Sequence, residues 1–389
     1  MKIVLTGGGT GGHITPILAV AHELKRLNSD AYIVYIGERN SKYAEMTSNN
    51  PDIDEIRTVY AGKFRRYHGE SWHQRLLDVR TNILNIRDLF YFILGTLQAV
   101  FLLKSLNPDV VLLKGGFVGV PTGLASAFWR YPFVTHDSDA VPGLANRLVA
   151  RWARYNATAM SPDYYNYPPE KVKHVGVLVG DDYHQISEEE QLQLKHEIGI
   201  PSHSRLLLVT GGSGGAQTIN NAVRSIVSDL LDSTPDLYVI HQVGKGKMGI
   251  YKDFQHPRLQ VAPLLFPLYQ FTGAADLIIT RAGANAIAEI GVQGRACIVV
   301  PNPLLAGGHQ TQNAKYLQEQ RAVEVVDEKT IRKDASKLGQ QVRKLLENKT
   351  RRLDLGKRMN EVTIPDATSK LSMILLDIAK RTDTKTESI

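Results

Sequence analysis

The sequence has a single cysteine and few of the features expected of exported or integral membrane proteins. Because Cys297 is the one thiol among 389 residues, no disulfide can form within one chain, and we expect a reducing cytoplasm. The first residues lead into the β-like run Lys2–Leu5 rather than into a basic and then apolar leader. The uncharged stretch 89–103 is shorter than the ~20 residues that a spanning helix needs.

Metal-binding signatures are also scarce. No Cys/His cluster supports a zinc site, and neither of the two glycine-rich turns described below carries the lysine of a P-loop. Asp137-Ser138-Asp139 has the DxD form with which metal-dependent nucleotide-sugar enzymes hold Mn²⁺ or Mg²⁺, but Asp52-Ile53-Asp54 matches it equally. We therefore expect neither a metal nor a cofactor.

The composition, 43% hydrophobic and 22% charged, is typical of a soluble globular protein, and the length favours two domains. The net charge of +7 is concentrated locally, because Arg57 to Lys104 contains eight basic residues, among them Arg65, Arg66 and Arg75, against three acidic ones. This segment includes the apolar stretch 89–103. Two interpretations stay open, a helix buried against a sheet and a basic, apolar face on an anionic membrane, and they can hold together if one side of the helix is buried and its flanks touch lipid. We do not expect nucleic acid as a partner.

Apolar runs that read as β-strands alternate with helical stretches along the chain. They span residues 2–5, 31–36, 110–113, 133–135 and 156–160, and then 205–209, 238–242, 277–280, 296–300 and 323–326. Continuous apolar runs separated by helices indicate parallel sheets covered on both faces. We predict an α/β protein with two Rossmann-like, doubly wound domains and a linker within Gly180–Pro201.

Each half opens with a strand, a glycine-rich turn and a helix. The first turn, GGGTGGHITP at 7–16, contains Gly7-x-Gly9-x-x-Gly12, and Glu38 ends the next strand where a ribose-binding acid would lie. An NAD-dependent oxidoreductase is therefore an alternative. The second turn, GGSGGAQ at 211–217, needs its own ligand, and no hydride-transfer residues are evident.

His13 follows the first glycines at the start of a helix. A neutral imidazole there can take a proton from a substrate hydroxyl. The alternative is a histidine that only hydrogen-bonds the backbone.

The second half contains two more polar loops. In RAGANAIAE, 281–289, small residues allow a diphosphate close to a helix N-terminus, and Glu289 can accept hydrogen bonds from both ribose hydroxyls. The loop 301–314 brings His309, Gln310 and Asn313 to the start of another helix, where amides can bind sugar hydroxyls or cap the helix.

Together these motifs resemble the MurG family of bacterial N-acetylglucosaminyltransferases, which have the two-domain GT-B fold and make the peptidoglycan precursor lipid II. The matching segments are GGGTGGHITP, KGGFVGVPTGLAS at 114–126, HDSDAVPGLANR at 136–147, GGSGGAQTIN at 211–220, RAGANAIAEI at 281–290 and HQTQNA at 309–314. They lie in order over most of the chain.

The resemblance implies inverting, metal-independent transfer of GlcNAc from UDP-GlcNAc to an undecaprenyl-diphosphate-linked muramyl peptide, with His13 as the base. It implies an acceptor and membrane-docking domain, 1–178 with a helix at about 363–380, a donor domain, 179–362, and a frayed tail, 381–389. The implied donor-binding residues are Thr10, Gly11, Gly12, Ser213, Leu265, Ala284, Asn285, Ala286, Ile287, Ala288, Glu289 and Gln310, and those at the acceptor diphosphate are His136, Asp139 and Asn146.

It also implies a peripheral location on the cytoplasmic face of the cell membrane, with the anionic membrane and other cell-wall enzymes as partners. The alternative within this architecture is another lipid or hydrophobic acceptor.

Two positions depart from the family pattern. Asp139 stands where the family usually has asparagine, and a carboxylate near diphosphates is repulsive unless a cation or donor compensates it. Gly180 stands where the family has an arginine, so the diphosphate needs another cation.

Overall fold

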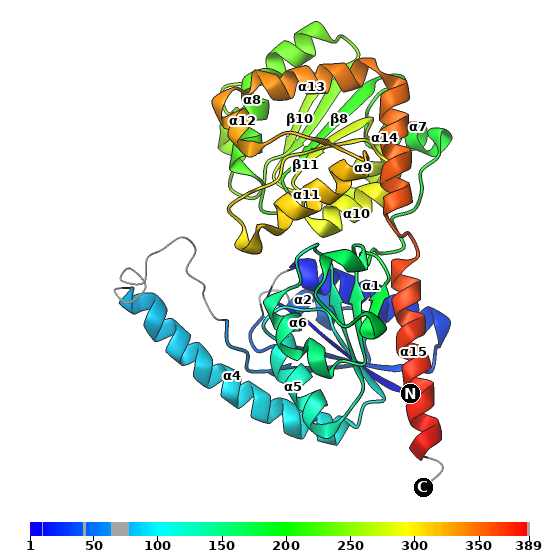
Figure 1. Ribbon diagram of the computed structural model, residues 1–389. Coiled ribbons are helices and arrows are strands. Elements are labelled where there is room, and N and C mark those ends of the chain that lie inside the picture. The colour runs from blue at the N-terminus through cyan, green and yellow to red at the C-terminus, as the bar shows by residue number, and fades with distance from the viewer. Residues whose placement is uncertain (10, 42–43, 64–77, 387–389) are drawn as a thin grey trace. The chain divides into compact units, whose positions relative to one another are not determined.

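The computed structural model describes residues 1–389 except residues 10, 42–43, 64–77 and 387–389 (Figure 1). The chain divides into two compact units, unit 1 with Met1–Gly180 and Asp366–Ile389, and unit 2 with Asp181–Pro365. Each unit has its own parallel sheet, which confirms the expected class of two Rossmann-like domains.

The sheet of unit 1 has the order β3-β2-β1-β4-β5-β6-β7, and all its strand pairs are parallel. Its strands are β1 (Lys2–Thr6), β2 (Tyr32–Glu38), β3 (Glu55–Val59), β4 (Val110–Leu113), β5 (Phe133–Asp137), β6 (Tyr155–Thr158) and β7 (Val172–His174). Its helices are α1 (Gly11–Leu27), α2 (Ala44–Ser48), α4 (Val79–Leu106), α5 (Gly119–Trp129), α6 (Leu144–Val149) and α15 (Ala367–Thr386), with 3-10 turns at Ala150–Trp152, Pro162–Tyr164 and Pro169–Lys171.

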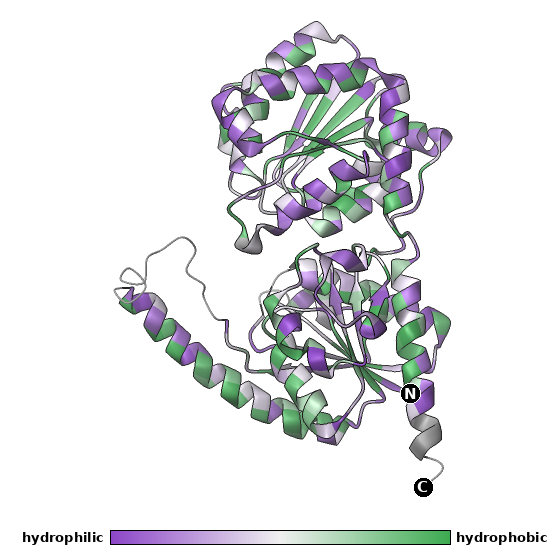
Figure 2. Cartoon of the chain, viewed as in Figure 1, coloured by the Kyte–Doolittle hydropathy of each residue, from purple (hydrophilic) through white to green (hydrophobic). Residues whose placement is uncertain are grey.

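The central strands are apolar on both faces because helices cover both. Leu5 of β1 pairs with Tyr35 of β2 on one side and with Leu112 of β4 on the other, and all three are buried. Figure 2 shows these strands in the hydrophobic colour. Since the strands are parallel, the loops after β1, β4 and β5 leave from one edge of the sheet.

Unit 2 repeats this plan with the strand order β10-β9-β8-β11-β12-β13, again all parallel. Its strands are β8 (Arg205–Thr210), β9 (Leu237–Gln242), β10 (Leu259–Ala262), β11 (Leu277–Thr280), β12 (Cys297–Val299) and β13 (Glu324–Val325). Its helices are α7 (Glu188–Glu197), α8 (Gln217–Ser233), α9 (Leu268–Ala274), α10 (Ala284–Val292), α11 (His309–Glu319), α12 (Glu328–Lys333), α13 (Ser336–Glu347) and α14 (Lys349–Val362), with 3-10 turns at Met248–Tyr251 and Ala306–Gly308.

The last helix, α15, belongs to unit 1, where it packs against α1. Leu371 and Leu375 are fully buried there, and Thr368 exchanges hydrogen bonds with the backbone of Val179. The helix continues to Thr386, so residues 381–386 are helical rather than frayed.

Four elements differ from the sequence-based expectation. The strands β3, β7 and β10 were not predicted, because each lies at the edge of a sheet and is short or polar. Helix α7 lies inside the expected linker, where Ser187 caps its N-terminus by accepting from the backbone N–H of Glu190.

Helix α4 is longer and more exposed than a helix buried against a sheet. Its buried side comprises Asp88, Gly95, Ala99, Leu103 and Leu106. Gly95 allows close contact, because a Cβ atom there would lie 1.7 Å from the carbonyl oxygen of Tyr60. Helix α4 is therefore buried on one side only, and the expectation of a buried helix holds for that side.

Candidate active site

In unit 1 the loops that follow β1 and β4 pass so close together that only glycine fits. A Cβ atom on Gly116, whose φ is +79°, would lie 2.2 Å from the carbonyl oxygen of Gly8. One on Gly115 would lie 3.8 Å from both His13 and Asn146. The glycines thus allow His13 at the start of α1 and Asn146 in α6 to lie on either side of the loop after β4. Thr10 lies outside the described residues.

His13 lies in the first turn of α1 and is partly buried. Its Nδ1 is 3.0 Å from the carbonyl oxygen of Gly8. Since a carbonyl only accepts, Nδ1 carries the proton and the basic lone pair is on Nε2. Burial, and then the charge of Lys114, lower the pKa of His13 to about 4. The imidazole is therefore neutral at pH 7, as a general base must be.

Lys114, the first residue after β4, is a site residue that the sequence reasoning missed. Its side chain is 3% exposed, and its Nζ donates a hydrogen bond of 2.7 Å to the hydroxyl of Ser138. Burial lowers its pKa to about 8, while the charges of Asp137 and Asp139 oppose that shift. The charges of Lys114 and Asp139 are thus close enough to influence each other.

Asp137 and Asn146 hold the loop after β5 in place. One carboxylate oxygen of Asp137 accepts from the backbone of Gly143 and from the amide of Asn146, both at 2.9 Å, and the other accepts from the Tyr167 hydroxyl at 2.8 Å. The same amide of Asn146 donates to the carbonyl of His136. The first carboxylate of the DxD motif, Asp137, thus accepts hydrogen bonds that hold the loop after β5.

His136 is fully buried, and its Nε2 lies 2.9 Å from the carbonyl oxygen of Gly176. Burial holds its pKa well below the usual range. Of the three residues expected at the acceptor diphosphate, His136 and Asn146 are therefore buried in the fold, and Asp139 is the one that is partly exposed.

In unit 2 the glycine turn after β8 exposes Ser213, as a ligand-binding turn must. Gln242, at the end of β9, fixes this turn, since its amide nitrogen donates to the carbonyl of Gly212 at 3.1 Å. Its amide oxygen accepts from the backbone N–H of Leu265 at 2.8 Å. Gln242 thus joins two segments of the expected donor site. The backbone N–H of Leu265 is therefore already hydrogen-bonded within unit 2.

Helix α10 begins at Ala284, and no acidic residue lies in its first turn. Within it, Ile287 and Ala288 are buried in the core of unit 2, so their side chains do not face a ligand. Glu289 is partly buried, and burial raises its pKa to about 7 while the Tyr183 hydroxyl, which donates to it, opposes the shift.

Tyr183 was also missed by the sequence reasoning. It lies more than a hundred positions from Glu289, so no local pattern joins the two. Its ring packs edge-on against Tyr269 with centroids 6.2 Å apart, which holds the hydroxyl at the carboxylate.

Gln310 and Asn313 shape the loops at the start of α11. The amide oxygen of Gln310 accepts from the backbone of Asn302 at 3.0 Å, and the amide nitrogen of Asn313 donates to the carbonyl of Ala282 at 3.0 Å. Gln310 is mostly buried, so in this structure it supports the loop.

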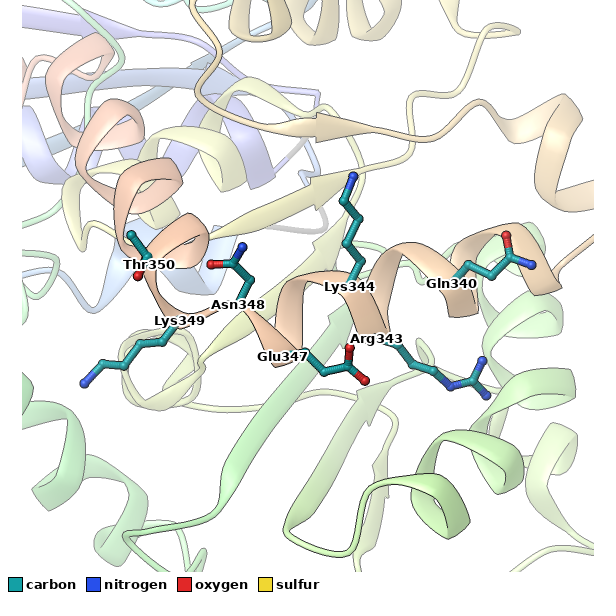
Figure 3. A pocket seen from close by; sticks show the side chains of 7 residues that line it. All are labelled: Gln340, Arg343, Lys344, Glu347, Asn348, Lys349 and Thr350. Atoms are coloured by element: carbon teal, nitrogen blue, oxygen red, sulfur yellow. The ribbon is translucent and has the colours of Figure 1, made fainter.

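A separate hollow lies at the junction of α13 and α14 (Figure 3). It is lined by Gln340, Arg343, Lys344, Glu347, Asn348, Lys349 and Thr350. It contains none of the expected site residues, and we assign no ligand to it.

Comparison with protein families gives two matches that follow each other along the chain. The model of the glycosyltransferase family 28 N-terminal domain matches residues 3–158, and that of the C-terminal domain matches residues 206–371.

Relatives align over nearly the whole chain. The UDP-N-acetylglucosamine–N-acetylmuramyl-(pentapeptide) pyrophosphoryl-undecaprenol N-acetylglucosamine transferase of Halalkalibacterium halodurans is 30% identical and covers 98% of this chain and 100% of its own. The transferase of the same name from Acetivibrio thermocellus is 28% identical and covers 98% and 99%.

Solved structures agree on the fold. MurG of Acinetobacter baumannii has a TM-score of 0.71 at 23% identity, covering 97% of this chain and 99% of its own. A UDP-GlcNAc 2-epimerase from Neisseria meningitidis, bound to UDP-GlcNAc, has a TM-score of 0.63 at 15% identity, covering 97% and 100%.

The Tyr183–Glu289 pair gives a testable pH dependence. Because the folded pKa of Glu289 is raised from its ordinary value of 4.5 to about 7, this group stabilises the fold below about pH 4.5, and that contribution is lost as the pH rises through 7. We expect carboxyl NMR to find Glu289 titrating near 7 in the wild type, and higher in Tyr183→Phe, which lacks the opposing hydrogen bond.

Glu289→Gln assigns the resonance and removes this pH dependence of stability. A Glu289 pKa near 4.5, or one unchanged in Tyr183→Phe, would contradict the assignment.

Proposed function

Because the chain belongs to glycosyltransferase family 28, in the MurG group of transferases, we propose that it moves GlcNAc from UDP-GlcNAc to the undecaprenyl-diphosphate-linked muramyl peptide, converting lipid I to lipid II. The observation that carries this is the 30% identity over 98% of the chain with a transferase of that activity. Because the chain belongs to this family, the alternative of an NAD-dependent oxidoreductase, which rested on the first glycine turn, is set aside.

The acceptor belongs to unit 1 in this proposal. The Nε2 lone pair of His13 takes the proton of the muramyl 4-hydroxyl, whose oxygen forms a bond to the anomeric carbon of GlcNAc. The bond from that carbon to the diphosphate breaks, UDP leaves with the electron pair, and the configuration inverts. No metal is required, because backbone amides and cations meet the leaving charge.

The donor belongs to unit 2. The exposed glycine turn at Ser213 and the N-terminus of α10 offer backbone N–H groups, and the absence of an acidic residue in the first turn of α10 leaves its dipole unopposed. Glu289 accepts from the ribose hydroxyls, and Tyr183 orients its carboxylate. The uracil is bound through the carbonyl of Leu265.

Lys114 explains how the acceptor side tolerates both departures from the family pattern. Its ammonium is close enough to influence Asp139 and His13, and it lies in the loop after β4. Its charge offsets that of the carboxylate at 139 and adds positive potential for the acceptor diphosphate, where Gly180 stands in place of the family's arginine. Because the ammonium is buried, it acts through its field and not by contact.

The low pKa of His13 then has a functional consequence. Before substrate binds, burial and Lys114 keep the ring neutral. A diphosphate dianion beside Lys114 cancels that positive charge and raises the pKa of His13, so the base becomes stronger when the acceptor is in place.

Removal of the base tests this mechanism. With UDP-GlcNAc and a lipid I analogue, the wild type should release UDP and form the disaccharide product, and His13→Ala should turn over about 10²–10⁴-fold more slowly. UDP binding should change less than about twofold, since the uridine lies in unit 2. His22→Ala, an exposed histidine of the same helix, is the matched control. Near-normal turnover in His13→Ala would remove it from the base role, and no disaccharide from the wild type would refute the function.

We further propose that α4 attaches the protein to the membrane surface. By length and composition α4 is the one helix of the described chain that is long and apolar enough to cross a membrane, yet its second half is fixed to unit 1 through Gly95, Ala99 and Leu103. An amphipathic helix packed on one side lies in the interface rather than across it.

The exposed side of α4 carries apolar residues at helical spacing. They are Val79, Ile83, Ile86, Phe90, Ile93, Leu97 and Phe101, with exposed fractions from 48% to 71%. Phe128 of α5 is exposed as well. Arg80 and Lys104 lie at the two ends of this stripe, as expected for contact with anionic lipid. Arg65, Arg66 and Arg75 lie outside the described residues.

Polar substitution of the stripe tests the membrane contact. The triple variant Phe90→Ser, Leu97→Ser and Phe101→Ser should sediment with anionic liposomes more than tenfold more weakly, since each large apolar side chain contributes about 1.5–3 kcal/mol on burial. Met248→Ser, a partly exposed apolar residue of unit 2, should bind as the wild type does. Equal sedimentation of all three proteins would contradict the proposal.

A further inference from the structure

Unit 2 has a pocket at the edge of its sheet opposite to the glycine turns. Its volume is about 300 Å³, at the small end for ligand sites. Its lining comes from the starts of β8, β11 and β12, from one side of α7, from the loop 202–204 and from the first residues of α14. Five cations line it, namely Lys195, Arg205, Arg295, Lys349 and Arg352, against the two carboxylates Glu188 and Asp276.

Three of these cations have carboxylate partners. The ammonium of Lys195 lies 2.7 Å from Asp276, and that of Lys349 lies 2.9 Å from Glu188. Arg205 forms a bidentate salt bridge with Asp236. Both lining carboxylates are therefore already paired, and Asp276 also accepts from the backbone N–H of Leu206.

The other two cations, Arg295 and Arg352, have no carboxylate hydrogen-bond partner among the described residues. Arg352 donates to the carbonyls of Leu345 and Leu346. Arg295 is only 9% exposed, and its Nη2 donates to the carbonyl of Ile186 at 2.9 Å. Its Nε is buried and has no hydrogen-bond partner in the part of the chain that the structure describes.

A buried guanidinium with an unused donor is costly unless an anion accepts from it. Burial lowers the pKa of Arg295 to about 10, while the charges of Asp276, Glu190 and Glu188 oppose the shift. The first turn of α14 contains Lys349 and Arg352 and no acidic residue, so the positive end of the helix dipole adds to their charge. Lys349 is labelled in Figure 3. The pocket therefore has an excess of positive charge and an unfilled donor.

We propose that this pocket binds a small oxyanion of the phosphate class through Arg295 and Arg352. The guanidinium fork matches such an oxyanion, and the hydroxyl-bearing loop Ser202–Ser204 lines the same pocket. Glycosyl transfer does not require this site. Its position links two segments, because Arg295 lies on the connection from α10 to β12 and holds Ile186 ahead of α7.

The test uses inorganic phosphate and the full-length protein, saturated with UDP so that the proposed donor site is filled. The Nε–Hε NMR signal of Arg295, assigned by its loss in Arg295→Lys, is followed during titration with phosphate and, at matched ionic strength, with chloride. We expect this signal to shift saturably with phosphate alone. In Arg352→Met, the same signal should report phosphate binding at least tenfold weaker, while Lys337→Met, which removes an exposed cation outside the pocket, should leave the affinity unchanged within about twofold.

An Arg295 signal that phosphate does not move, or that chloride moves equally, overturns the proposal and makes Arg295 a structural residue. Unchanged affinity in Arg352→Met also overturns it. The wild-type titration decides the question even if Arg352→Met fails to fold, and none of these outcomes bears on glycosyl transfer, which is assayed separately.

Discussion

The proposed acceptor site in unit 1 depends on the buried charge of Lys114 and its interactions with the neighbouring charged groups. Lys114 lies at the end of β4, where glycines let two loops pass within contact of each other, and it donates to Ser138 while facing the charges of Asp137 and Asp139. The same charge contributes to keeping His13 neutral. One cation thus offsets the carboxylate at 139 and, after burial, helps to keep the proposed base neutral. Such a balance is possible only where burial excludes water from the group.

The sequence predicts the architecture well because the central strands are continuous apolar runs, and their glycine turns stand directly before helices. The strands β3, β7 and β10 were not predicted. Each lies at the edge of its sheet, where a strand is less covered and does not need a continuous apolar run. Helix α7 was not predicted because its residues are mostly polar, and its burial depends on contacts with α9 that arise only in the fold.

The site was predicted less completely than the fold. Motifs point to His13 and Glu289, but their pKa values are shifted first by burial and then by Lys114 and Tyr183, which no local pattern connects to them. Conversely, His136, Asn146, Ile287 and Ala288 belong to matching motifs, yet the structure buries their side chains. A motif records which residues occur together, whereas burial decides which of them can meet a ligand.

NMR titration of the His13 imidazole in the wild type and in Lys114→Met tests most directly whether the charge of Lys114 helps to hold His13 neutral. We expect a pKa near 4 in the wild type and a higher one in the variant, still below 6.5 because burial remains the larger cause. A His13 pKa that is unchanged or lower in Lys114→Met would show that the charge of Lys114 does not have this role.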